Sequence, residues 1–308
     1  MGITPLEAEQ RLAAPLLDGD EGRAIAELGA IGRENLEFTG RCYALAITGG
    51  MVRASLAFGR AGFHLNVMDE PAVKAELAAA GGATRGLVDF MQRYRSCKAQ
   101  RTYYLPIVQD PAAVKPIRAL LGEGVGLTER DCSELLSLAV RQDNVALARV
   151  LVEGGARLAV DIHEAAPSDL AGKMSMEAPA NPWADQLSPR SSLSMISFII
   201  EQMAGDPCPI RADWFKLYFR DPQFSEKLAL IAPHGDVATC ECADALLTEL
   251  ARGGHTQAVR AVLGWKGFEA DACEGALAVA RDCGHVEIAA ALLQALHSNA
   301  PALEPLSF

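Results

Sequence analysis

Two cysteines near the middle of the C-terminal half could supply thiolate ligands to zinc. Cys240 and Cys242 are separated by one residue, and histidines and further cysteines lie on either side of them. A structural zinc site needs four converging ligands, usually two pairs whose members are separated by about two to four residues. The Cys-x-Cys spacing is tighter than this, and the remaining cysteines fall at small apolar positions of expected helices. We therefore expect no metal site and no other cofactor.

Two further motifs resemble parts of enzyme active sites. His163-Glu164 begins like the zinc-protease motif, but Pro167 occupies the place of the second histidine and ends the helix that would align the pair. Glu7 and Glu9 have the Glu-x-Glu form of some arginine-directed ADP-ribosyltransferases, although such a pair on a first helix ordinarily faces solvent or the helix dipole. Nucleophile-elbow, phosphate-loop and dinucleotide-binding patterns are absent from the sequence. We therefore expect no catalytic residues.

The elements that would position any site are indicated by a repeat. Four segments share a small apolar pair, two variable positions, a Gly or Asp, and then an amphipathic helix; they are 45–58, 139–152, 250–263 and 280–293. Their Gly or Asp residues are Gly49, Asp143, Gly254 and Gly284. Weaker copies extend the series to anchors at 20, 82, 112, 191 and 222. The spacing stays near 31 residues except for one interval that is about 17 longer, and such a period is typical of a solenoid.

Each unit of this repeat has a simple physical basis. A first helix ends at a glycine that can adopt the left-handed conformation, and a second helix then runs back. Small residues such as Ala139 let neighbouring units approach closely, while Leu151 and Leu263 are expected to fill the shared core. The sequence therefore predicts an all-α fold, a solenoid of about nine stacked helix-turn-helix repeats that forms a single domain over 1–308. We expect a proline-containing loop at 167–190, inserted within one repeat, and a C-terminal tail at 297–308.

The clearest copy of the internal repeat resembles a known family. Gly284-His285-Val286-Glu287-Ile288, followed by Leu292, resembles the inner part of an ankyrin repeat, and the segment from Leu250 to Leu263 resembles a second copy. The resemblance implies that His255 and His285, and Asn144 at the matching position, are structural residues, the histidines through hydrogen bonds between repeats. No unit carries the family's Thr-Pro-Leu-His opening, and the period is nearer 31 than 33. We interpret the units as degenerate, bacterial-type ankyrin-like repeats with short or missing β-hairpin fingers.

Composition limits the class of function. The 308 residues carry a formal charge of −11, which argues against nucleic-acid binding because phosphate groups require a basic surface. Half of the residues are hydrophobic and 22% are charged, which excludes a disordered chain. No apolar stretch approaches about 18 residues, and the N-terminus lacks the pattern of a cleaved signal peptide. We expect no membrane segment, and a protein that is cytoplasmic or is delivered to a host cell by a specialised secretion system.

Two irregular stretches could contact a partner. The 167–190 loop would expose Met174, Met176 and Trp183 for partner binding, or it could be a mobile excursion that shields a core edge. The most basic stretch contains Arg93, Arg95 and Arg101 and is followed by Tyr103 and Tyr104. It could dock an acidic or phosphorylated partner, or it could be a helix C-terminus followed by a linker.

The function favoured by these observations is a non-catalytic scaffold that binds another protein through its repeat surface. The acidic charge indicates a partner with a basic docking face. A bacterial effector that captures a host protein and an immunity-type protein that masks a toxin both fit this description. The alternative is the target-recognition region of an arginine-modifying, ADP-ribosyltransferase-type effector, and a third interpretation is a structural role in a larger assembly.

Overall fold

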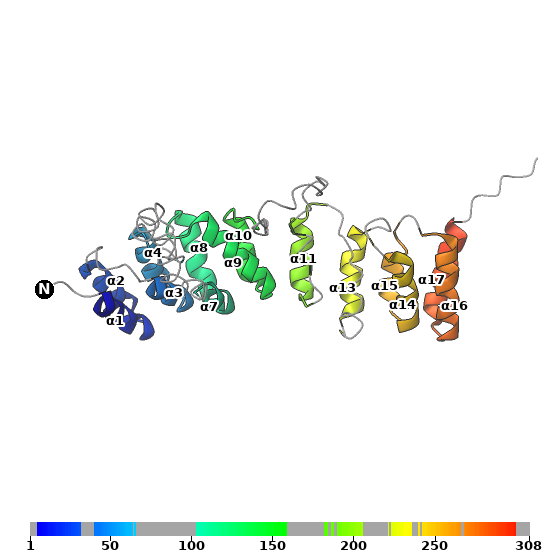
Figure 1. Cartoon of the computed structure of the whole chain (residues 1–308), viewed down its shortest axis with the longest axis horizontal. Coiled ribbons are helices and arrows are strands. Elements are labelled where there is room, and N and C mark those ends of the chain that lie inside the picture. Colours follow the sequence, from blue (N-terminus) through cyan, green and yellow to red (C-terminus); the bar gives the residue numbers. More distant parts are fainter. Residues whose placement is uncertain are drawn as a thin grey trace, which may run out of the picture. The chain divides into compact units, whose positions relative to one another are not determined.

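A computed structural model describes most of the chain, and every regular element in the described residues is a helix (Figure 1). The described residues are 5–31, 40–63, 65, 103–158, 182–183, 186–187, 190–205, 221, 223–235, 240, 242–265 and 268–299. No strand occurs among them, so the prediction of an all-α protein is confirmed.

The chain divides into two compact units, Met1–Leu170 and Ala171–Phe308. The boundary between them falls inside the loop predicted at 167–190. The expectation that 1–308 forms one continuous solenoid therefore stays a prediction.

The N-terminal unit is built from helix pairs in two rows. Its helices are α1 (Pro5–Leu17), α2 (Glu21–Ala30), α3 (Gly40–Thr48), α4 (Val52–Arg60), α7 (Tyr104–Gln109), the short 3-10 helix η4 (Pro111–Ala113), α8 (Val114–Glu123), α9 (Glu129–Arg141) and α10 (Val145–Glu153). The first helices α1, α3, α7 and α9 pack on one another in that order. The second helices α2, α4, α8 and α10 form the other row in the same way.

The junction between α4 and α8 differs from the sequence prediction. The period placed a repeat around Gly82 between the pairs α3–α4 and α7–α8. Instead α4 packs directly on α8, and Arg60 of α4 forms an ion pair with Glu123 of α8. An added Cβ at Gly59 would lie 3.1 Å from the Cα of Gly126, so the two backbones are in close contact. Within the described residues, no helix pair separates these two layers, and Gly82 itself lies outside them.

The C-terminal unit repeats the arrangement. It contains α11 (Leu193–Gln202), α13 (Phe224–Ile231), the 3-10 helix η6 (Ala232–His234), α14 (Ala243–Gly253), α15 (Thr256–Val262), α16 (Ala270–Asp282) and α17 (Val286–Asn299). The helices α11, α13, α15 and α17 pack in sequence as one row, and α14 packs on α16 beside them (Figure 1). The predicted tail at 297–308 is thus partly helical, because α17 extends to Asn299.

Five of the six described turns between first and second helices follow one local design, whereas in the α7–α8 turn Asp110 has a φ of −98° and caps the 3-10 helix η4. A residue with positive φ ends the first helix, and the next backbone N–H donates to the carbonyl five residues earlier, as in a Schellman motif. The left-handed residues are Gly19, Gly50, Asp143, Gly254 and Gly284. The prediction for Asp143, Gly254 and Gly284 is confirmed. For the segment 45–58 the predicted left-handed position is wrong by one residue, because Gly50, and not Gly49, has the positive φ of 70°.

The cores between stacked helices are filled by small and branched apolar side chains. Ala139, Leu151 and Leu292 are fully buried, as predicted from the repeat. Leu263 is only half-buried, which corrects the expectation that it fills the shared core. The helix α15 ends at Val262, which is fully buried and occupies that place, whereas Leu263 follows at the helix terminus.

Candidate functional site

At two of these turns, the residue that follows the left-handed position forms a hydrogen bond to a neighbouring helix pair. The side-chain amide Nδ2 of Asn144 donates to the carbonyl of Val108 at 2.7 Å, across to α7. At the equivalent position, His285 Nε2 bonds to the carbonyl of Arg252 at 3.1 Å, across to α14. The sequence resemblance implied a bond of this kind for His285, which is present, and the bond of Asn144 is an additional finding. These two side chains therefore join neighbouring helix pairs.

His255 is also a packing residue. Its Nδ1 lies 2.7 Å from the hydroxyl of Ser225, and its ring meets Phe224 edge-on with 5.2 Å between the centroids. Burial, together with the nearby charge of His285, lowers the pKa of His255. The ring is thus held as a neutral hydrogen-bonding group between α13 and α15, which is a structural arrangement.

Tyr104 does not belong to an exposed docking surface, which corrects the sequence prediction. Its side chain is 4% exposed, and its hydroxyl donates to the fully buried carboxylate of Asp131 at 2.5 Å. Asp131 also accepts hydrogen bonds from the backbone N–H and hydroxyl of Thr128, which cap α9. Burial and the Asp131 charge raise the pKa of Tyr104. This network joins α7 to α9, whereas the neighbouring Tyr103 is half-buried.

Trp183 lies against its own unit. The ring is half-buried and meets the buried ring of Phe198 edge-on at 5.6 Å, and the nearby Leu187 is 5% exposed. This part of the predicted 167–190 loop therefore contributes to packing on α11. The other predicted partner-binding residues lie outside the described part of the chain, and they are Met174, Met176, Arg93, Arg95 and Arg101.

The cysteines and histidines of the described residues do not converge on a metal-binding position. No group of three or more His, Cys, Asp or Glu side chains there could hold an ion. Cys240 and Cys273 are buried, and Cys242 is half-buried. Burial and the charge of Asp244 raise the pKa of the Cys273 thiol, which favours an unreactive thiol.

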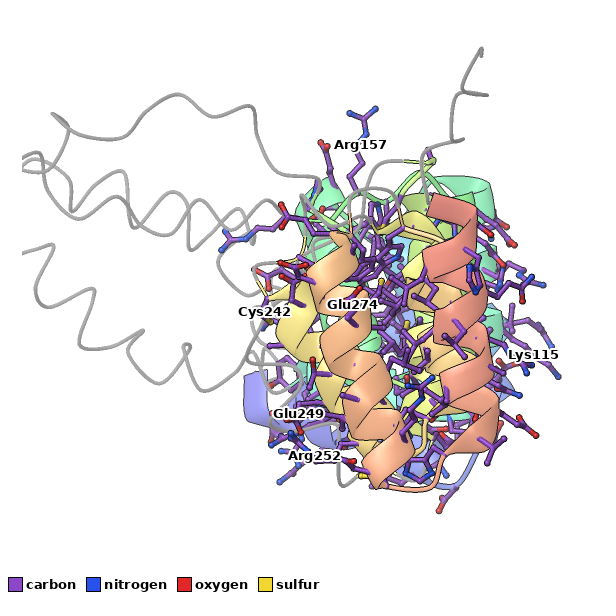
Figure 2. The ribbon with its side chains drawn as sticks, turned by 90° about the vertical axis from the view of Figure 1, so that its right-hand side faces the viewer. Lys115, Arg157, Cys242, Glu249, Arg252 and Glu274 are labelled. Atoms are coloured by element: carbon purple, nitrogen blue, oxygen red, sulfur yellow. The ribbon has the colours of Figure 1, made fainter. Side chains whose placement is uncertain are left out.

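The exposed surface of α14 and α16 gathers acidic side chains. Asp244 and Glu274 lie 30 residues apart, at equivalent positions of these two packed helices, and both are exposed together with Asp271. Figure 2 shows Glu274 on α16, and it shows Glu249 and Arg252 near the C-terminal end of α14. The two helices carry five carboxylates and two guanidinium groups in total. We call Asp244, Asp271 and Glu274 the acidic face.

The acidic face was not identified from the sequence. The 30-residue offset between Asp244 and Glu274 was available there, because it equals the distance from Gly254 to Gly284. Projecting every charged residue onto the repeat register would have revealed it.

Comparisons with known proteins give no further guide to this surface. No protein-family model matches the chain, and no curated protein or solved structure shows detectable similarity to it. In the described residues, none of the helices combines the length and the apolar character needed to span a membrane.

Proposed function

We propose that the protein is a non-catalytic scaffold that binds another protein, one with a basic docking face, through the exposed surface of its stacked helices. The observation that carries this proposal is the acidic face, which presents three exposed carboxylates on two adjacent first helices. Stacked helix pairs create an extended surface for recognition without needing a catalytic pocket. Capture of a host protein and masking of a toxin are both activities of this kind.

The geometry of the acidic face suits a basic protein surface. Packed helices lie about 8–10 Å apart, so Asp244 and Glu274 offer two carboxylates at about that separation. Asp271 is one turn from Glu274 on the same helix. Lys or Arg side chains can span these positions with separate ion pairs, and electrostatic attraction of this type mainly speeds association and selects the partner.

The proposal can be tested by neutralising the acidic face in the full chain. The variant D244N/D271N/E274Q removes it, and E129Q/E226Q/E287Q removes the same number of exposed carboxylates from other helices. Proteins captured from the native cell by the unaltered chain would be identified by mass spectrometry, and the affinity of the purified partner would then be measured for all three proteins. We expect the first variant to weaken binding about tenfold or more, and the matched control to change it less than about twofold.

Two results would contradict the proposal. One is a captured partner whose docking surface is acidic or uncharged. The other is an affinity that both triple variants change equally, since the effect would then come from the net charge of the chain and not from the acidic face.

A further inference from the structure

The second helices of the N-terminal unit are in a fixed register with one another. The helices α4, α8 and α10 are followed by Gly62, Gly124 and Gly155, each with positive φ. In each case the next backbone N–H donates to the carbonyl five residues earlier, at distances of 3.2, 3.1 and 2.9 Å in that order. Equivalent residues can therefore be assigned on the three helices by counting back from these glycines.

This register aligns four cations. Arg53 and Lys115 both lie nine residues before their glycine, on the neighbouring helices α4 and α8. Arg118 and Arg149 both lie six residues before theirs, on the neighbouring helices α8 and α10. All four residues are exposed, and Figure 2 shows Lys115 projecting outward from its helix. We call Arg53, Lys115, Arg118 and Arg149 the basic staircase.

The staircase has the length of a short extended peptide. Each step between packed helices covers about 8–10 Å, and the three residues from Lys115 to Arg118 add about 4.5 Å along α8. The full track therefore measures about 20–25 Å. An extended chain of about six or seven residues spans the same length.

Within the described residues, carboxylates lie close to two members of this row. Glu153 approaches Arg118 at 3.9 Å with both side chains 67% exposed, and Glu123 pairs with Arg60, which lies outside the row. Glu21 of α2 accepts a hydrogen bond from the backbone N–H of Arg53 at 3.0 Å. Exposed ion pairs of this type contribute little free energy and are readily exchanged. The helices α4, α8 and α10 also carry more cations than carboxylates.

We propose that the basic staircase binds an extended acidic segment of a protein, with carboxylates facing the four cations in turn. This surface lies on a different unit from the acidic face and has the opposite charge, so the inference goes beyond the proposed function and does not depend on it. At physiological salt the screening length is about 8 Å, so a short acidic segment experiences the local cations. A long polyanion such as DNA would also meet the acidic remainder of a chain with net charge −11.

The test uses the full chain and fluorescein-labelled peptides. Anisotropy would measure the binding of a peptide of about ten glutamates, a matching lysine peptide and a single-stranded DNA of about ten nucleotides, at about 50 and about 200 mM salt. The variant R53Q/K115Q/R118Q/R149Q removes the staircase, and R23Q/R130Q/R141Q/R281Q removes four exposed arginines from other positions. Circular dichroism would establish that each variant is folded, and the single variant K115E provides the same test with one exposed substitution.

We expect the glutamate peptide to bind the unaltered chain, and the staircase variant to weaken that binding about tenfold or more, while the control changes it less than about twofold. The lysine peptide should bind the staircase variant no more weakly than it binds the unaltered chain, which separates this surface from the acidic face. Equal effects of both quadruple variants, no binding of the glutamate peptide, or tighter binding of the DNA than of the peptide would each overturn the proposal.

Discussion

Gly126 provides the sharpest test of the contact between α4 and α8. Its φ is 73°, and an added Cβ would lie 2.3 Å from the Tyr43 hydroxyl oxygen and 2.6 Å from the Cα of Gly59. Tyr43 is fully buried, and its hydroxyl donates to the Gly126 carbonyl at 2.9 Å. The substitution Gly126→Ala would therefore both strain the backbone and displace a buried hydrogen-bonding side chain.

The magnitude follows from two contributions. A left-handed conformation costs an alanine about 1–2 kcal/mol. Displacing Tyr43 leaves a buried hydroxyl without its acceptor, which costs about 1–3 kcal/mol. Together we expect Gly126→Ala to lower the free energy of unfolding by about 2–5 kcal/mol. Gly124→Ala is the matched control, because Gly124 has a similar φ of 65° but open space around the added Cβ, so only the backbone cost applies.

Urea denaturation followed by circular dichroism would measure both variants, and hydrogen exchange of peptides from α3, α4 and α8 would locate the loss in the N-terminal unit. Gly126→Ala should be more destabilising than Gly124→Ala by about 1–3 kcal/mol. Equal losses in the two variants would refute the close approach of Gly59 and Gly126, and with it the direct packing of α4 on α8.

Three further predictions concern the cores and the buried network. Leu151→Ala should cost about 2–5 kcal/mol in urea denaturation, whereas Leu263→Ala should cost about 1 kcal/mol, since only the first side chain is fully buried; similar costs would show that the assignment of the core is wrong. Tyr104→Phe should cost about 1–3 kcal/mol because it removes a donor from the buried Asp131 carboxylate, and an unchanged urea midpoint would contradict that hydrogen bond. Because the pKa of His255 is lowered from its ordinary value of 6.5, the unfolded chain binds more protons, so stability should fall as the pH drops through 6.5 towards the folded pKa. The His255→Gln variant should lose less stability than the unaltered chain between about pH 7.5 and about pH 5.5, and equal losses would rule out His255 as the group responsible.

The turns of the fold could be predicted because their signals are local. A Gly or Asp followed by Asn144 or His255 specifies a helix end and the start of the next helix within a few residues. The one-residue error at Gly49 has a local cause as well, since Gly49 and Gly50 can both adopt a positive φ and the sequence does not distinguish them. The direct packing of α4 on α8 could not be predicted, because a period fixes the spacing of units along the chain but does not fix which helices are neighbours in space.

The burial of Tyr104 and the positions of the two charged surfaces were not predicted from the sequence for a related reason. Tyr104 follows a basic stretch and precedes Pro106, and this sequence context is typical of a linker. Its burial depends instead on a hydrogen bond to Asp131, which is 27 residues away. The repeat register of the sequence places Asp244 and Glu274 at equivalent positions, but only the packing of α14 on α16, and of α8 on α4 and α10, shows that such positions are neighbours in space. Net charge pointed to one kind of partner, whereas the two units present local surfaces of opposite sign.

The direct packing of α4 on α8 also has a consequence for the order of folding. Other bonds between stacked layers join residues 27–36 positions apart, such as Tyr104 with Asp131 and Val108 with Asn144, whereas Arg60 and Glu123 are separated by 63. Closing a loop twice as long costs about 0.6 kcal/mol more in chain entropy, and this cost is met before the contact forms. The helices α1–α4 and α7–α10 should therefore assemble as two separate nuclei, and their docking across α4 and α8 should be the late, slower step in folding of the N-terminal unit.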